Sequence, residues 1–261
     1  MSDNSLLCTV EDGHARVVLN RPKAHNALDG SLIDALSETL ASLETRADVR
    51  VVSLRGEGAS FCAGVDLKFF LGVLDDAPQL HGFIRKVQDA FTRLERFPKP
   101  VLAVVHGFVL AGGLEMSLAC DLVLAAEDAA LGDQHINFGL LPGGGASQRL
   151  PRVVGMRKAK ELMMMGSRVS GSEAERLGLV NKAVPAARLE AEAGEWVANL
   201  LEKTPTGLRT MKEMLHGSDG ASLKTGLALE ESLFLNYARL DDLREGLKAF
   251  SEKRKPSYRA S

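Results

Sequence analysis

The sequence predicts a layered α/β domain followed by an all-helical segment, and three observations support this prediction. Apolar runs without polar alternation, such as residues 101–105, indicate strands that are covered on both faces. Glycine-rich turns follow several of these runs and precede helix-like patterns. From about Ala186 onward only helical patterns occur. We therefore expect a core at residues 1–195 and a C-terminal helical segment at residues 196–261.

The elements of the core are predicted in chain order. Residues 16–20 form a strand that ends at Arg21-Pro22, because proline fits the end or edge of a strand. An apolar stripe after Asp29 predicts a helix, which Asp29 or Ser31 can cap. The stripe consists of Leu32, Ile33, Leu36, Leu40 and Leu43. Further strands are expected at residues 49–54, 101–105, 121–126 and 181–184.

Residues 101–126 are apolar over a length that could span a bilayer. Glu115 and Asp121 interrupt the run, however, and an Asp at mid-membrane costs about 2.5–3.5 kcal/mol on insertion scales. We therefore interpret this stretch as two buried strands flanking a buried helix. The methionines at residues 163–165 likewise predict the core of a helix.

The helical segment contains three patterns separated by short breaks. Leu223, Leu227 and Phe234 share one helical face, and Glu230 falls on the same face. That glutamate is either buried with a partner or part of a partly hydrated face. An exposed apolar face would be a candidate subunit interface, and the alternative is that these helices pack on a core of their own.

The composition excludes several classes of partner. The chain has 261 residues, of which 45% are hydrophobic and 25% are charged, as in ordinary globular proteins. A formal net charge of −2 gives no electrostatic reason to expect nucleic acid or a membrane surface as a partner. Three widely spaced cysteines and a polar N-terminus without a secretory signal favour a reduced, cytoplasmic protein.

Two glycine-containing turns carry the strongest chemical signal. Small residues at positions 62–64 let a ligand approach the backbone closely. Gly112-Gly113 precede a helix-like run, and the amides at a helix N-terminus are unpaired and attract an anion. Together, the two turns can supply two N–H donors. Such a pair stabilises the enolate or tetrahedral oxyanion that forms from a thioester.

The two turns also carry a family resemblance. The run Phe61–Asp66 followed by Ala111–Glu115 resembles the enoyl-CoA hydratase/isomerase (crotonase) family, and further matches lie at residues 19–24, 139–145 and 252–254. The resemblance implies a spiral core of ββα units, a C-terminal helical trimerisation segment, and a homotrimer or dimer of trimers. It also implies an acyl-CoA thioester substrate. Coenzyme A then enters as part of the substrate, and no cofactor is bound permanently.

The resemblance assigns site residues as well. The amides of Val65 and Gly112 would form the oxyanion hole. Ala63 would meet the adenine through its carbonyl group, and the lysines among the CoA-binding positions could offset phosphate charge. In the family, the positions that match Phe234 and Lys253 often act across a subunit boundary. The CoA-binding positions are Lys23, Ala24, Ala63, Asp66, Leu67, Phe234 and Lys253.

Glu115 lies three residues beyond Gly112, so one helical turn brings its carboxylate near the mouth of the oxyanion hole. It matches one of the two glutamates of the hydratases, and its apolar neighbours indicate burial with a raised pKa. The position of the second glutamate holds His135. An imidazole can also transfer protons, so we predict a catalytic role for His135. Whether Asp133 orients His135 stays open.

Three functional hypotheses follow. The first is water addition to a 2-enoyl-CoA with one catalytic Glu replaced by His. The second is another reaction on the same oxyanion hole, either double-bond isomerisation or the hydrolytic cleavage of a carbon–carbon or thioester bond by a β-keto- or acyl-CoA hydrolase. The third is an inactive CoA-binding or interaction protein. The sequence has no dinucleotide fingerprint, no nucleophile elbow and no metal-ligand spacing, so no metal site is expected.

Overall fold

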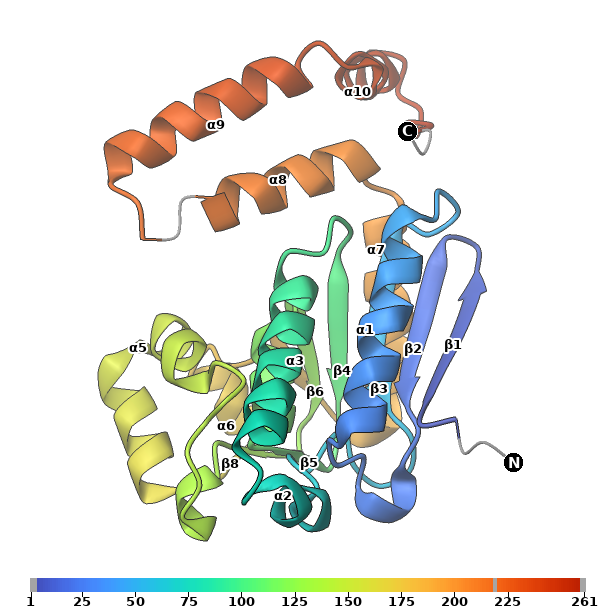
Figure 1. Ribbon diagram of the computed structural model, residues 1–261. Helices are drawn as coiled ribbons and strands as arrows, with labels where there is room; N and C mark the ends of the chain where they lie inside the picture. The colour runs from blue at the N-terminus through green and yellow to red at the C-terminus, as the bar shows by residue number, and fades with distance from the viewer. Residues whose placement is uncertain (1–3, 218–219, 259–261) are drawn as a thin grey trace.

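The computed structural model describes residues 4–217 and 220–258 (Figure 1). The core is built on a large sheet with the strand order β1-β2-β3-β4-β6-β9, in which only the β1–β2 pair is antiparallel. Its strands are β1 (Leu6–Glu11), β2 (His14–Leu19), β3 (Val51–Gly56), β4 (Val101–Val105), β6 (Leu122–Ala126) and β9 (Lys182–Val184). A smaller sheet contains β5 (Phe108–Leu110), β7 (Ala130–Gly132) and β8 (Val169–Ser170).

Helices cover both faces of the large sheet, as the apolar runs predict. Every residue of β4 is buried, and so is every residue of β3 except the last. Helices α1 (Gly30–Thr45) and α3 (Ala77–Glu95) lie on one face, and α7 (Leu189–Leu201) lies on the other (Figure 1). Asp29 caps α1, because its Oδ1 accepts the Leu32 N–H at 2.9 Å. Helix α7 extends across residue 195, the boundary predicted from the sequence.

The chain repeats one local path through the core. It leaves a strand of the large sheet, enters a short strand of the small sheet, and then forms a helix. The path β4–β5–α4 (Gly112–Leu118) follows this pattern, as does β6–β7 followed by η2 (His135–Phe138) and α5 (Ala146–Met165). After β3 the corresponding short strand is a single bridge, from Cys62 to Val109, and α2 (Leu67–Val73) follows it. The repeat confirms the predicted ββα spiral.

The C-terminal helices lie at the end of the core that is farthest from α2 (Figure 1). They are α8 (Pro205–Gly217), α9 (Leu223–Tyr237) and α10 (Asp241–Ser251). Helix α9 contacts α8 but has no buried residue. Its half-buried residues are Gly226, Leu229, Leu233 and Tyr237, whereas the stripe identified in the sequence, with Phe234 54% exposed, faces outward. Glu230 is exposed too, so it is not a buried, partnered glutamate.

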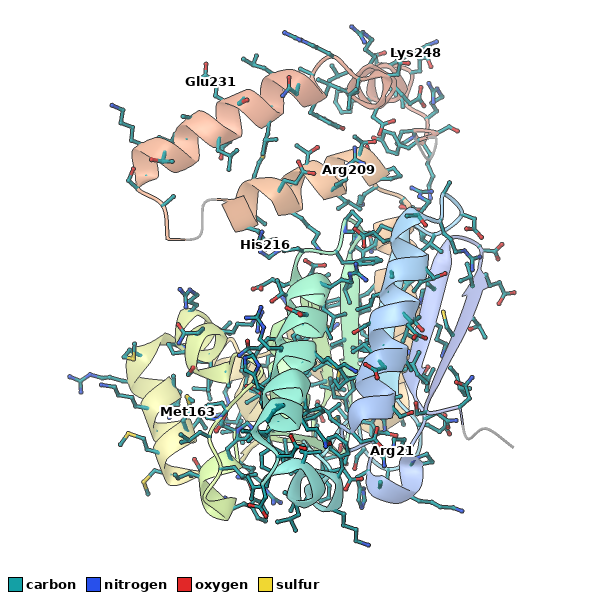
Figure 2. The ribbon with its side chains drawn as sticks, in the orientation of Figure 1. Arg21, Met163, Arg209, His216, Glu231 and Lys248 are labelled. Carbon is teal, nitrogen blue, oxygen red and sulfur yellow. The ribbon has the colours of Figure 1, made fainter. Side chains whose placement is uncertain are left out.

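Two details of the sequence analysis need correction. Strand β3 begins at Val51 rather than at residue 49, because its register with β2 starts at the pair His14 and Val51. Of the methionines 163–165 only Met163 packs against the core, since Met164 is 73% exposed and Met165 is 72% exposed. They lie on α5, at the edge of the core, where Figure 2 labels Met163.

Candidate active site

Four of the predicted site residues line a single narrow cavity of about 60 Å³. These residues are Val65, Gly112, Glu115 and His135. The remaining lining is mostly apolar and includes Leu28, Phe70, Phe83, Ile84, Val87, Leu140 and Leu141. Because these residues come from separate loops and helices, only the folded core brings them together.

The loop after β3 brings Val65 to this cavity and leaves its N–H unpaired. Leu28 and Val65 form an isolated parallel bridge, in which the Leu28 N–H donates to Gly64 O at 2.7 Å and the Asp66 N–H donates to Leu28 O at 2.8 Å. In such a bridge the intervening residue directs its own N–H to the opposite side. No acceptor for the Val65 N–H occurs in the part of the chain that the structure describes.

The second free amide belongs to Gly112, the first residue of α4. The preceding Ala111 has φ 48° and ψ −116°, a strained conformation for a residue with a side chain. Its N–H donates to Gly132 O at 2.9 Å, and its carbonyl accepts the Glu115 N–H at 3.0 Å. Both ends of Ala111 are therefore fixed, and the Gly112 N–H has no acceptor among residues 4–217 and 220–258.

Glycines let the two loops pack against one another. A Cβ on Gly64, whose φ is +107°, would lie 2.9 Å from the Cβ of Ala111. A Cβ on Gly113 would lie 2.2 Å from the carbonyl oxygen of Cys62. The sequence analysis attributed the small residues at 62–64 to the approach of a ligand, whereas here they serve the contact between the loops that carry the two amides. Cys62 itself is fully buried.

Glu115 is held rigidly at the wall of the cavity and is only 2% exposed. Its Oε1 accepts two amide hydrogen bonds, from Gly144 at 2.8 Å and from Ala146 at 2.9 Å. Burial raises the pKa of Glu115, and the two amides and His135 oppose that increase only in part. A Cβ on Gly144 would lie 2.8 Å from Oε2, so glycine is needed there to admit the carboxylate.

His135 is 7% exposed and lies between two carboxylates. Its Nε2 is 3.8 Å from Glu115 Oε2, and its Nδ1 is 3.1 Å from Asp133 Oδ1. Nδ1 and Oδ1 are within hydrogen-bonding distance, although ring and carboxylate are poorly aligned for a hydrogen bond. Burial alone would lower the pKa of His135, but Asp133 and Glu115 outweigh burial, and the pKa of His135 is raised. The two carboxylates therefore stabilise the protonated ring relative to a free imidazole.

Five of the seven predicted CoA-binding residues lie in segments close to this cavity. Lys23 and Ala24 line an open pocket of about 520 Å³ beside Arg21. The Ala63 N–H donates to His25 O at 3.0 Å, and the carbonyl of Ala63 receives no hydrogen bond from the described residues. Leu67, the first residue of α2, is exposed.

Asp66 is committed to holding the fold in place. It caps α2 by accepting the N–H groups of Lys68 and Phe69, and it pairs with Arg21 at 2.9 Å. Arg21 also pairs with Asp29, the cap of α1, at 2.9 Å. One guanidinium therefore joins the caps of two helices. Sequence reasoning did not identify Arg21 in this role, although its position directly after β2 and before a proline was visible.

Phe234 and Lys253 are not brought to the cavity within one chain. They belong to α9 and to the turn after α10, and the cavity lies near α2 at the other end of the molecule (Figure 1). Figure 2 shows the same separation between Arg21 at one end and Glu231 and Lys248 at the other. The structure of one chain therefore does not bring Phe234 and Lys253 together with the other predicted site residues.

The sequence analysis also missed the amides that hold Glu115. Residues 143–145 were noted only as part of a family match. Three glycines directly before the helix that starts at Ala146 are nevertheless a physical signal, because they free the backbone to wrap around a buried acceptor. The signal indicates an anion at this turn, and the anion is a side chain of the protein.

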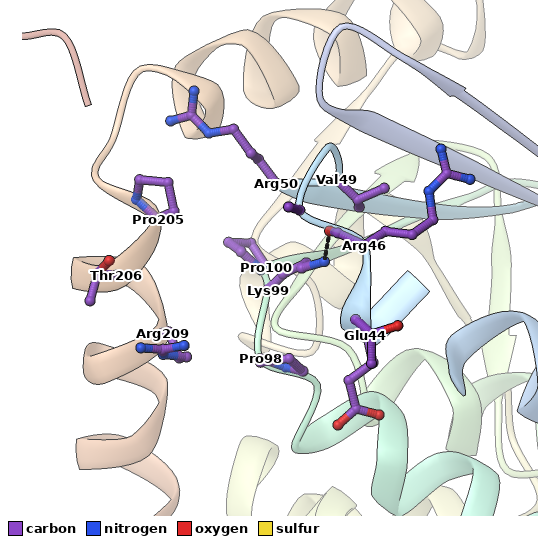
Figure 3. A pocket seen from close by; sticks show the side chains of 12 residues that line it. Glu44, Arg46, Val49, Arg50, Pro98, Lys99, Pro100, Pro205, Thr206 and Arg209 are labelled. Atoms are coloured by element: carbon purple, nitrogen blue, oxygen red, sulfur yellow. Dashed lines mark hydrogen bonds between the residues drawn. The ribbon is translucent and has the colours of Figure 1, made fainter. Parts of the chain in front are cut away.

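A second cavity, between α8 and the core, has a different character (Figure 3). It measures about 180 Å³ and contains several basic side chains, which already have protein partners. Lys99 donates to Leu43 O at 2.7 Å and to Arg46 O at 2.6 Å, and Arg46 pairs with Asp48 at 2.5 Å. These contacts fix the end of α1, and the cavity offers little free charge to a ligand.

Within residues 4–217 and 220–258, no group of three or more His, Cys, Asp and Glu side chains could hold a metal ion. No helix in the same ranges combines the length and the apolar character needed to cross a membrane.

Comparison with known proteins places this geometry in a family. The model of the family described as enoyl-CoA hydratase/isomerase matches residues 9–261. Human enoyl-CoA hydratase domain-containing protein 2, mitochondrial, is 38% identical, over 95% of this chain and 86% of that protein. The short-chain-enoyl-CoA hydratase of Clostridium acetobutylicum is 33% identical, over 98% of this chain and 97% of that protein.

Solved structures agree with the sequence comparisons. The crystal structure of an enoyl-CoA hydratase from Bacillus anthracis superposes with a TM-score of 0.94, at 36% identity, and covers 98% of this chain and 100% of that one. An enoyl-CoA hydratase from Polaromonas gives a TM-score of 0.93 at 33% identity, covering 97% and 99% of the two chains. The α/β spiral is therefore the crotonase fold, and the chain belongs to the enoyl-CoA hydratase/isomerase family.

Proposed function

We propose that this enzyme adds water to a 2-enoyl-CoA thioester. The observation that carries the proposal is the single cavity in which two free amides face a buried carboxylate and an imidazole. The acyl chain would occupy the apolar part of this cavity. The relatives support the proposal, because several are named enoyl-CoA hydratases.

The amides of Val65 and Gly112 would bind the thioester oxygen. When water attacks the β-carbon, the electron pair moves through the α-carbon to that oxygen, and an enolate forms. Two fixed N–H donors stabilise the enolate more than the ground-state carbonyl, and loss of one such donor costs about 3–4 kcal/mol of transition-state stabilisation. Because only backbone is used, a valine at position 65 serves as well as any other residue.

Glu115 and His135 would handle the protons. Oε1 of Glu115 is occupied by two amides, so Oε2 is free to accept a proton from the attacking water. The water oxygen bonds to the β-carbon, and imidazolium Nε2 of His135 gives its proton to the α-carbon. Glu115 then returns a proton to His135 across the 3.8 Å that separates Oε2 from Nε2. The net reaction is addition of one water molecule.

Coenzyme A would lie along the loops that lead to the cavity. We propose contacts with Lys23, Ala24, Ala63, Asp66 and Leu67, with the free carbonyl of Ala63 accepting from the adenine amino group. Since the Asp66 carboxylate is already engaged by Arg21 and by the amides of α2, its contact with CoA would use backbone atoms. No other cofactor is needed for the proposed reaction.

The direct test is turnover of thioesters by the purified protein. A short 2-enoyl-CoA should lose its conjugated absorbance and yield a 3-hydroxyacyl-CoA. If that substrate is inert while a 3-enoyl-CoA is isomerised or a β-keto thioester is cleaved, hydration is the wrong reaction. If CoA thioesters bind and none turns over, the protein is a binding module.

A further inference from the structure

A carboxylate that the proposed mechanism does not use lies next to His135. Asp133 is 1% exposed, and its Oδ1 is 3.1 Å from His135 Nδ1. We propose that Asp133 is a positioning residue that holds the imidazole with Nδ1 toward itself and Nε2 toward Glu115 and the cavity. The inference rests on the proposed function, because it gives His135 the orientation that proton transfer to the substrate requires.

The backbone explains why the two side chains meet. Gln134, between them, has φ 41° and ψ −10°, a left-handed conformation that is uncommon for a residue with a side chain. The His135 N–H donates back to the carbonyl of Asp133 across this turn. Residues 133 and 135 therefore do not occupy the spaced positions of a strand, and their side chains lie against each other.

The side chain of Gln134 secures this turn. It is buried, its Nε2 donates to Gly166 O, and its Oε1 accepts from Arg168 Nε at 2.9 Å. Asn137 Nδ2 donates to the same Gly166 carbonyl at 2.9 Å. The segment that carries Asp133 and His135 is thus anchored on the turn after α5, and the positions of both groups are set by the fold.

Unpaired buried polar atoms also support a contact between Asp133 and His135. In the described residues, Asp133 Oδ2 and His135 Nδ1 are among the few buried side-chain atoms without a hydrogen-bond partner. A buried polar group left unpaired is costly, and no Lys or Arg of the described chain pairs with Asp133. The two groups are complementary, since one is an N–H donor and the other a carboxylate. Catalytic hydrogen bonds that are poorly aligned without substrate commonly tighten when substrate binds.

The charged groups that face His135 favour this orientation of its ring. Asp133 faces it from its own segment, and Glu115 faces it from α4. On α5, the Ala146 amide donates to Glu115, and Arg149 is directed to Glu95 at 2.8 Å. Both carboxylates raise the pKa of His135, against the effect of burial. The proton on Nε2 is thereby kept available on the side of the substrate.

The experiment compares Asp133→Asn with Asp133→Glu and with Asp128→Asn, which removes an exposed charge from the same segment. For Asp133→Asn we expect kcat to fall roughly 10- to 100-fold, because a misplaced imidazole loses part of its contribution as a general acid. We expect KM to stay within about twofold, as for a group that acts only in the chemical step. The alkaline limb of kcat/KM should move to lower pH. Asp133→Glu should recover part of the loss, and Asp128→Asn should behave like the wild type.

A second pair of measurements separates a positioning role of Asp133 from a merely structural one. In a His135→Gln background, Asp133→Asn should cost little more, because its effect passes through the imidazole. An equal loss in both backgrounds, or an unmoved alkaline limb, would overturn the proposal. If the wild type hydrates no thioester, NMR titration of the His135 ring still decides. A lower pKa in Asp133→Asn supports the contact, and an unchanged titration refutes it.

Discussion

At the residue scale, the proposed mechanism gives His135 the role that a second glutamate has in the hydratases. A carboxylate in that position must take up a proton before it can donate one, whereas the two carboxylates beside His135 raise the pKa of its ring and so favour the protonated form. Glu115 acts as the base, since two amides fix one of its oxygens and leave the other to accept a proton from water. The pair therefore divides base and acid between two chemically different groups.

Replacement of Glu115 tests the base. Glu115→Gln keeps the size of the side chain and a carbonyl oxygen for the amides of Gly144 and Ala146, but it cannot take a proton from water. We expect kcat to fall by about 10²- to 10⁴-fold, the usual worth of general base catalysis, while the affinity for CoA is unchanged. Kinetics with a 2-enoyl-CoA and calorimetry with CoA measure the two quantities. Unchanged turnover would remove Glu115 from the mechanism.

The pH dependence of kcat/KM should form a bell that is displaced upward. Activity is lost as pH falls through the pKa of Glu115, because the protonated carboxyl is no base, and burial places that pKa above the ordinary 4.5. Activity is also lost as pH rises through the pKa of His135, which is raised above the ordinary 6.5. A pH series on wild type and His135→Gln checks this. An alkaline limb of the same shape in the variant would show that another group donates the proton.

At the scale of elements, the sequence predicts those parts that depend on periodicity. The buried strands, the capped helix α1 and the helical C-terminal region follow from apolar spacing and from Asp29. The left-handed turn at Gln134 does not, because glutamine has no preference for that conformation and only distant anchors at Gly166 and Arg168 impose it. The register of β3 likewise depends on a partner strand rather than on its own residues.

The candidate site, too, could be predicted from the sequence only in part. The two amides, Glu115 and His135 follow from motifs, since each lies in or beside a glycine turn or at a matched position. The contact between Asp133 and His135 and the amides that hold Glu115 required coordinates, because they join residues through turns whose geometry is set by tertiary packing. Sequence patterns record the local preference of a residue and not the distant contacts that override it.

The contact between the two amide-bearing loops gives a prediction about α4. Gly113→Ala places a Cβ against the carbonyl of Cys62, so the loops must separate, and we expect a loss of about 1–3 kcal/mol of unfolding free energy together with lower kcat. Gly194→Ala in α7 is the control, because nothing lies within 4 Å of its added Cβ. That change should stabilise the protein by about 0.5–1 kcal/mol. Denaturant unfolding measures both, and a harmless Gly113→Ala would refute the close packing.

At the scale of the whole molecule, two of the predicted CoA-binding residues lie in the C-terminal helical segment, away from the cavity. Phe234 and Lys253 lie far from the cavity, and the outer stripe of α9 is exposed together with apolar residues of α8 and α10. These exposed residues are Met211, Leu215, Leu223, Leu227, Phe234, Leu235, Leu247 and Phe250. Large contiguous apolar faces mark interaction sites. We propose that copies of the chain associate through them as a trimer or a dimer of trimers, and that each copy lends Phe234 and Lys253 to the CoA site of a neighbour.

Leu227→Asp should break this assembly, because it places a charge in the middle of the outer stripe while Leu229 and Leu233 keep α9 packed on α8. The chain has a mass of 28.0 kDa, and sedimentation should show a trimer or hexamer for the wild type and a smaller species for the variant. Met165→Asp, an equivalent change on exposed α5, is the control that should keep the wild-type mass. The variant should also show a raised KM for acyl-CoA, since the neighbour's lysine is lost. A variant that dissociates yet retains its KM would separate assembly from CoA binding, and an unaltered mass would place the interface elsewhere.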